Sequence, residues 1–104
     1  MIHISIFEKT GSFAENKDVA RDIRKKEIMP LIEDKTDVIL DFQGVDTTTQ
    51  SFIHALVSDL LRHYGTDILD RITFQSCSPT VKKIIEIVVE YTQEGMSHPE
   101  HINE

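Results

Sequence analysis

The stretch VILDFQG, residues 38–44, decides the fold class of this chain. Its first five residues are almost continuously apolar and lie between Asp37 and Gly44. Such a run is typical of a short strand that is buried on both faces of a parallel sheet. We therefore expect residues 38–42 to form the central strand, with neighbouring strands and covering helices on either side in the sequence.

The segment before this strand predicts one strand and one helix. Residues 2–7 alternate isoleucine with polar residues, which indicates a half-buried strand. A turn is expected at residues 9–12, followed by a helix capped by Asn16 or Ser12. Pro30 interrupts that helix, and its apolar residues lie on different faces near its two ends. We therefore expect a kinked or two-part helix.

The segment after the central strand contains the clearest helix, at residues 51–64. Its apolar residues fall on one arc, while Ser58 and the neighbouring polar residues face away. Ser51, or Thr49 with a looser boundary, stands at the N-cap position. Gly65 stands where a left-handed C-terminal cap belongs.

The last third of the chain predicts a third strand and a third helix. Residues 72–75 alternate apolar and polar side chains, and Ser78 followed by Pro79 is a helix-start signal. The resulting β-α-β-α-β-α order implies a small, mainly parallel sheet with helices packed on it. We expect one α/β domain over residues 1–94 and a flexible tail over residues 95–104, which have no apolar pattern.

Composition excludes several classes of protein. The chain has 104 residues, a net charge of −7 and 39% hydrophobic residues, which suits one globular domain. The acidic balance argues against a nucleic-acid partner, because phosphate binding needs clustered Lys and Arg. No signal peptide or membrane span is evident at the N-terminus, so we expect a cytoplasmic protein without a membrane partner. The single cysteine, Cys77, excludes an internal disulfide and an all-cysteine metal site.

No motif in the chain predicts catalysis or a cofactor. Asp41 and Asp46 flank the Gly44 turn and could hold a cation or form an acid–base pair, but no nucleophile is spaced to use them. Cys77 precedes a helix start, where a lowered pKa would make it reactive; the simpler interpretation is a small buried residue. His98 and His101 in the tail are three residues apart, but no thiolate or third histidine is nearby to complete a metal site. We expect no enzyme, metal or cofactor.

The longer stretch VILDFQGVDTTTQSFIHAL, residues 38–56, resembles STAS domains, which are named for sulphate transporters and anti-sigma factor antagonists. It is most similar to a bacterial STAS-like family of unknown function. The resemblance implies a non-enzymatic regulator that docks on a protein partner, such as an ATP-binding kinase-like protein, through the loop and helix start after the central strand. The implied contact residues are Asp46, Thr47, Thr48, Thr49, Gln50, Ser51 and Phe52, with Asp41 and Gly44 in support, and the surface extends to Ala55.

The sequence departs from the antagonists at the position that accepts a phosphoryl group. Gln50, which has no hydroxyl, stands where they have the acceptor serine, and Phe52 replaces a glycine. A shift of one residue would make Ser51 or Thr49 the acceptor. A simpler interpretation is that Ser51 only caps the helix.

The sequence leaves two further functions open. One is a small-molecule or anion-binding domain that uses the helix N-terminus. The other is a homodimeric assembly module, joined through an exposed strand edge or an apolar helix face.

Overall fold

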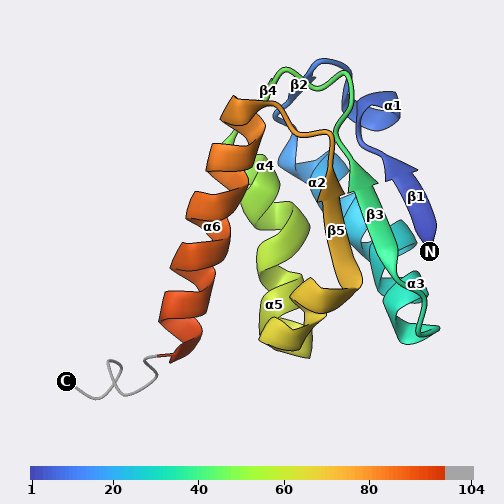
Figure 1. Cartoon of the computed structure of the whole chain (residues 1–104), viewed down its shortest axis with the longest axis vertical. Helices are drawn as coiled ribbons and strands as arrows, with labels where there is room; N and C mark the ends of the chain where they lie inside the picture. Colours follow the sequence, from blue (N-terminus) through green and yellow to red (C-terminus); the bar gives the residue numbers. More distant parts are fainter. Residues whose placement is uncertain (98–104) are drawn as a thin grey trace.

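Three parallel strands form the central sheet, in the order β1-β3-β5 (Figure 1). The computed structural model describes residues 1–97 of the chain. The strands are β1 (Ile2–Ser5), β3 (Val38–Asp41) and β5 (Ile72–Gln75), so the expected α/β class and the central position of β3 are confirmed. The other elements are α1 (Phe7–Thr10), β2 (Phe13–Ala14), α2 (Lys17–Ile23), η1 (Arg24–Ile28), α3 (Met29–Glu33), β4 (Thr47–Thr48), α4 (Gln50–Ile53), η2 (His54–Ser58), α5 (Asp59–Tyr64), η3 (Thr66–Arg71) and α6 (Pro79–Ser97).

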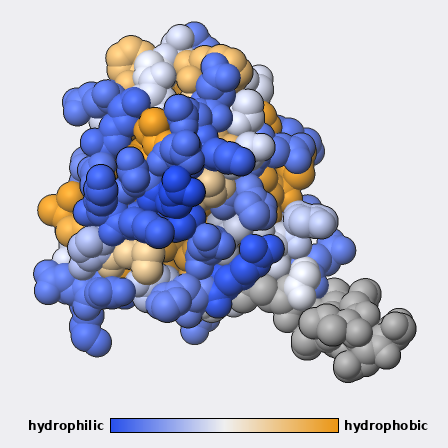
Figure 2. Space-filling view, turned by 180° about the vertical axis from the view of Figure 1, so that it is seen from behind, coloured by the Kyte–Doolittle hydropathy of each residue, from blue (hydrophilic) through white to orange (hydrophobic). Residues whose placement is uncertain are grey.

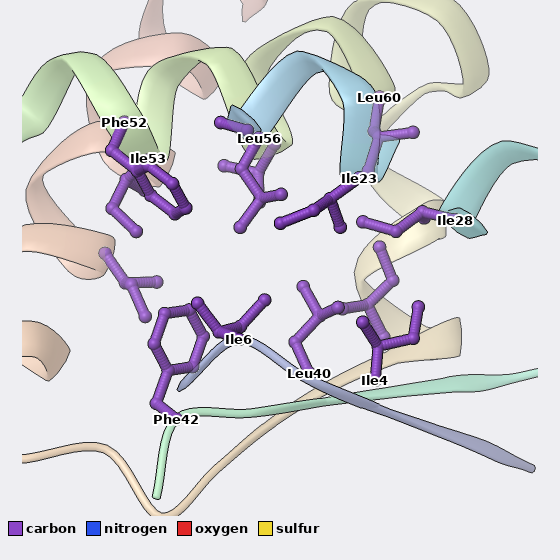
Figure 3. Packing of buried hydrophobic residues seen from close by; sticks show 14 of the residues in the cluster. Ile4, Ile6, Ile23, Ile28, Leu40, Phe42, Phe52, Ile53, Leu56 and Leu60 are labelled. Atoms are coloured by element: carbon purple, nitrogen blue, oxygen red, sulfur yellow. The ribbon is translucent and has the colours of Figure 1, made fainter. Parts of the chain in front are cut away.

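The hydrophobic core lies between one face of the sheet and the helices (Figure 3). Ile4, Leu40 and Phe42 point from the strand side toward Ile23 and Leu56 on the helices. Burial of such aliphatic and aromatic side chains stabilises the fold by roughly 1.5–3 kcal/mol for each of them.

No helix covers the opposite face of the sheet within residues 1–97 (Figure 1), but Val38, Ile39 and Leu40 of β3 are all buried, so the expectation of a strand buried on both faces holds for these residues. In this parallel register His3, Ile39 and Thr73 are neighbours on that face, and His3 and Thr73 are exposed. Ile39 is nevertheless only 9% exposed. The side chains of His3 and Gln75 make contact across the central strand, Nε2 to Nε2 at 3.2 Å.

The first long helix, residues 17–33, is formed by α2, η1 and α3, and η1 is a π-helix. Asn16 is its N-cap, which was one of the two expected candidates. The Met29 N–H donates to the carbonyl of Arg24, five residues before it in the chain. Because π hydrogen bonds join residues five apart, Ile23 and Ile28 both face the core. The interruption that was expected in this helix is therefore a π turn just before Pro30.

The second long helix, residues 50–64, is formed by α4, η2 and α5 and also contains a π turn. This turn makes the prediction for Ser58 wrong. Ser58 is fully buried, and its hydroxyl lies 2.9 Å from the Thr92 hydroxyl of α6. A regular α-helix would have turned this side chain toward solvent, whereas the π turn directs it to α6.

The structure differs from the prediction at three places near the strand ends. β1 ends at Ser5, and α1 replaces the expected turn before Gly11. Residues 13–14 and 47–48 form a second, two-stranded parallel sheet that the sequence did not predict. These strands are too short for a period-two pattern to be visible in the sequence.

α6 begins at Pro79 with Ser78 as its cap, as expected, because the Val81 N–H donates to the Ser78 hydroxyl at 3.1 Å. It continues to Ser97, inside the stretch that was expected to be a tail. The tail histidines lie outside the described residues. In the described part of the chain, no helix has both the length and the apolar character of a membrane span. The face behind that of Figure 1 is mostly hydrophilic, with scattered hydrophobic patches (Figure 2).

Candidate functional site

The loop that follows the central strand is held in one conformation by its own side chains. Asp41 Oδ1 accepts a hydrogen bond of 3.0 Å from the Gln43 N–H, which closes the turn before Gly44. Gly44 has a φ of +91°, and an added Cβ would meet the Phe7 ring at 2.8 Å. Both the conformation and the space therefore require glycine here.

The following residues are tied to the N-terminal part of the chain and to α6. The Asp46 N–H donates to the Ser12 carbonyl at 2.8 Å, and the Asp46 carbonyl accepts from the Ser78 hydroxyl at 3.0 Å. The Thr48 hydroxyl is buried and donates to the Ala14 carbonyl at 2.6 Å. The predicted contact loop is thus a braced connection between three parts of the chain.

Thr49, and not Ser51, is the N-cap of the second long helix. Its hydroxyl accepts a hydrogen bond of 3.1 Å from the Phe52 N–H. Ser51 lies inside the first turn and is exposed at the surface, so the interpretation of Ser51 as a cap is wrong. Phe52 is fully buried in the core and has no side-chain surface for a partner, which corrects its place among the contact residues.

The exposed part of the helix start lines a groove between α4 and α6. This α4–α6 groove has a volume of about 500 Å³. Ile87 and Tyr91 of α6 are 40% and 73% exposed and form one wall. The groove is lined by Lys17, Gln50, Ser51, His54, Ala55, Ile87, Val88 and Tyr91.

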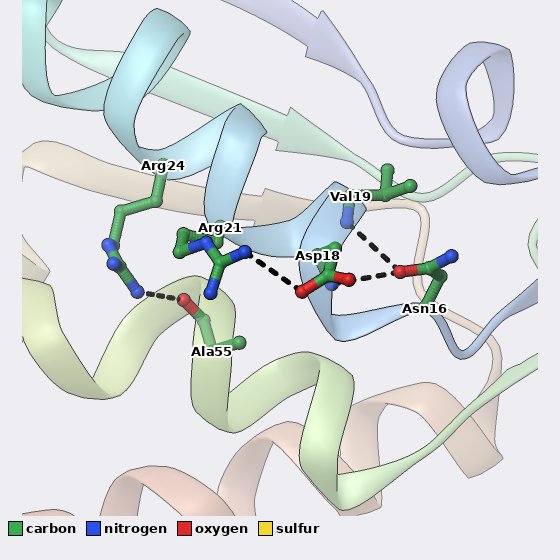
Figure 4. A network of polar contacts seen from close by, with 6 residues as sticks. All are labelled: Asn16, Asp18, Val19, Arg21, Arg24 and Ala55. Carbon is green, nitrogen blue, oxygen red and sulfur yellow. Dashed lines mark hydrogen bonds and ion pairs between the residues drawn. The ribbon is translucent and has the colours of Figure 1, made fainter.

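A buried arginine contacts Ala55, one of the residues that line this groove (Figure 4). Arg24, at the start of η1, is only 6% exposed. Its Nη1 donates to the backbone carbonyl of Ala55 in η2 and lies 3.1 Å from Asp59 Oδ2. A buried charge is tolerated when it is paired and hydrogen-bonded in this way. The contact fixes the position of Ala55 in the groove.

The sequence did not predict this role of Arg24. The residue lies in a run of three basic side chains, Arg24, Lys25 and Lys26, and only Arg24 turns inward. The one signal in the sequence is its position directly after the apolar Ile23, and a regular helical period does not bring that position to the buried face.

The carboxylates and the cysteine do not form a reactive centre. The side chain of Asp41 is used in its turn, and Asp46 is exposed. Burial raises the pKa of the Cys77 thiol, the Lys82 ammonium partly lowers it, and the Asp41 carboxylate adds to the increase. This direction is the opposite of the one that the reactive alternative for Cys77 requires. No group of three or more potential metal ligands occurs in residues 1–97.

Comparison with known families gives one match. A family described as a STAS-like domain of unknown function matches residues 19–82, which are more than half of the chain and include the central strand, most of the first long helix, all of the second and β5. No curated protein and no solved structure matches this chain. STAS-like domains are generally non-enzymatic. The fold, the matched region and the loop after the central strand agree, and the chain belongs to the family of STAS-like domains of unknown function.

Proposed function

We propose that this protein is a regulatory domain that docks on a partner protein through the α4–α6 groove and the adjoining loop at residues 46–50. The observation that carries the proposal is the exposure of Ile87 and Tyr91 beside the helix start at Ser51. Exposed apolar side chains next to polar ones are typical of protein interaction sites, in which aromatic residues contribute strongly to affinity.

We further propose that the partner is an ATP-binding, kinase-like protein and that it phosphorylates Ser51. The sequence left two candidate acceptors, Ser51 and Thr49, and their environments differ from each other and from that of the neighbouring Thr48. Thr49 caps its helix and Thr48 is buried, whereas Ser51 is exposed in the groove. A phosphate on Ser51 would lie in the first turn of a helix of 15 residues, near the positive end of the dipole, with Lys17 on the same groove.

Site-specific photo-crosslinking in cell extract with ATP tests the docking surface. A photoreactive amino acid at Tyr91 is compared with one at Asp67, an exposed residue of η3 outside the groove. We expect Tyr91, and not Asp67, to yield one crosslinked protein with an ATP-binding fold, identified by mass spectrometry. Recovery of the bait alone, or equal capture from both positions, would contradict the proposal.

The phosphorylation step is tested on the same captured material. We expect added phosphate mass on Ser51 and none in a Ser51→Ala variant that keeps its partner. Phosphate at Thr49 instead would contradict the assignment of Ser51. A rise in melting temperature with phosphate or nucleotides, without any partner, would favour the anion-binding alternative.

A further inference from the structure

We propose that β5 and α6 form a second docking surface, which receives an extended segment of a partner protein as a fourth strand of the sheet. This surface lies on the opposite side of α6 from the α4–α6 groove, and it does not depend on the function proposed for that groove. We name it the β5–α6 groove. Its lining includes the apolar Leu69, Phe74 and Val89 and the charged Lys82, Glu86 and Glu90.

The backbone of β5 offers hydrogen bonds on its free side. The Phe42 N–H donates to the Gln75 carbonyl at 2.9 Å, so Gln75 turns its backbone N–H and C=O groups toward β3. Neighbouring residues in a strand alternate in this direction. Ile72 and Phe74 therefore turn their N–H and C=O groups away from β3. Within residues 1–97 no strand pairs with that side of β5.

An apolar depression lies directly beside this edge. Two adjoining cavities of about 350 and 430 Å³ share Phe74, Ile85 and Glu86. Leu69, Phe74 and Val89 are only half-buried, although each packs against the core. In the view of Figure 1 the second long helix is drawn between α6 and β5, and residues of both α6 and β5 line the two cavities. An added strand would place alternate side chains into this depression.

The charges at the rim indicate what kind of segment fits. Glu86 and Glu90 lie along the open side of α6, and Lys82 is near its beginning. A segment with apolar residues at every second position and a Lys or Arg near the two glutamates would complement them. The net charge of −7 disfavours a second copy of this acidic chain as the occupant.

A selection from random peptides tests the proposal. The probe is a displayed library of random twelve-residue peptides, selected on the full chain and counter-selected on a Val89→Arg variant, whose side chain would fill the groove. Tyr91→Arg, on the other side of α6, is the matched control. Thermal unfolding checks that both variants fold. We expect enriched peptides with alternating apolar residues and at least one basic residue.

The enriched peptides are then measured on the unmodified protein by fluorescence polarisation and NMR. We expect amide shifts centred on β5 and a similar loss of affinity, about tenfold, for two changes that leave the core intact. One is the variant Glu86→Lys/Glu90→Lys of the protein. The other is a peptide with one backbone amide N-methylated, at a position that would pair with β5. Tyr91→Arg should leave the affinity unchanged.

Three results would overturn the proposal. The first is failure to enrich any peptide on the full chain. The second is a set of amide shifts centred on α4 instead of β5. The third is a concentration-dependent dimer that is lost in Val89→Arg, which would assign the groove to a second copy of the chain.

Discussion

The two long helices, residues 17–33 and 50–64, share one plan but differ in how they are held. Each begins at a capping side chain and contains a π turn near its middle, and their last turns meet where Tyr64 contacts Glu33. The first helix packs one apolar stripe on the sheet and extends Arg24 toward its neighbour. The second is contacted by the first helix and by α6, and it buries the Ser58 hydroxyl against Thr92 of α6.

This difference shows that the effect of a π turn depends on which elements pack against it. In the first helix the turn keeps Ile23 and Ile28 on the same face. In the second it directs Ser58 to Thr92 and leaves the Ala55 carbonyl where Arg24 can reach it. π turns are often associated with functional sites, and residues of this one line the α4–α6 groove.

Among these tests, replacement of Arg24 should change the free energy of unfolding most. We expect Arg24→Met to lower the free energy of unfolding by about 3 kcal/mol, because the partly buried Ala55 carbonyl loses a charged donor. Arg21→Met is the matched control, since Arg21 makes only an exposed pair with Asp18 and should cost at most about 0.5 kcal/mol. Urea unfolding measures both values. Equal losses would show that Arg24 does not join the two helices.

Removal of the buried hydroxyl pair tests the feature that belongs to the second helix alone. We expect Ser58→Ala to cost about 1.5 kcal/mol, because the Thr92 hydroxyl is left without its partner. The double variant Ser58→Ala/Thr92→Val should recover part of that loss, since no unpaired donor then remains. Thermal and urea unfolding are measured for the unmodified chain, the two single variants and the double variant, which together form a double-mutant cycle. Strict additivity of the two single variants would mean that the hydroxyls are independent.

The caps test whether the two helices begin in the same way. Asn16 accepts from the Asp18 and Val19 N–H groups, and Thr49 accepts from the Phe52 N–H. We expect Asn16→Ala and Thr49→Ala each to lower the free energy of unfolding by about 1 kcal/mol. Ser51→Ala should change it by less than about 0.5 kcal/mol, because Ser51 is not the cap. A larger loss for Ser51→Ala than for Thr49→Ala in urea unfolding would reverse our assignment.

The smallest effect is expected where the two helices end. Partial burial and a hydrogen bond of 3.0 Å to Glu33 raise the pKa of Tyr64 above its ordinary value. The neutral phenol is thereby favoured in the folded state, so its contribution to stability is present below pH about 10 and is lost as the pH rises through the raised pKa. In a Tyr91→Phe background, absorbance titration should show a lower pKa for Tyr64 after Glu33→Gln. An unchanged titration would mean that Glu33 does not contribute.

Much of the fold could be predicted because its signals are local. The apolar run at residues 38–42, the cap at Asn16 and the Ser78–Pro79 start each express a preference of a few neighbouring residues. The loop after the central strand was identified in the same way. Within it, the sequence left both Ser51 and Thr49 as candidates for the cap, because such patterns do not fix a helix start to within two residues.

By itself, the sequence determined the class of this protein: an acidic α/β domain with three strands, three helical regions and a loop of the STAS-like type. These features follow from local periodicity and capping, which depend on residues close together in the chain. Only the tertiary structure decided that Arg24 and Ser58 are buried, that one face of the sheet is open, and that α6 separates two grooves. The physical reason is that these features depend on contacts between residues 31 or more positions apart, which no local pattern encodes.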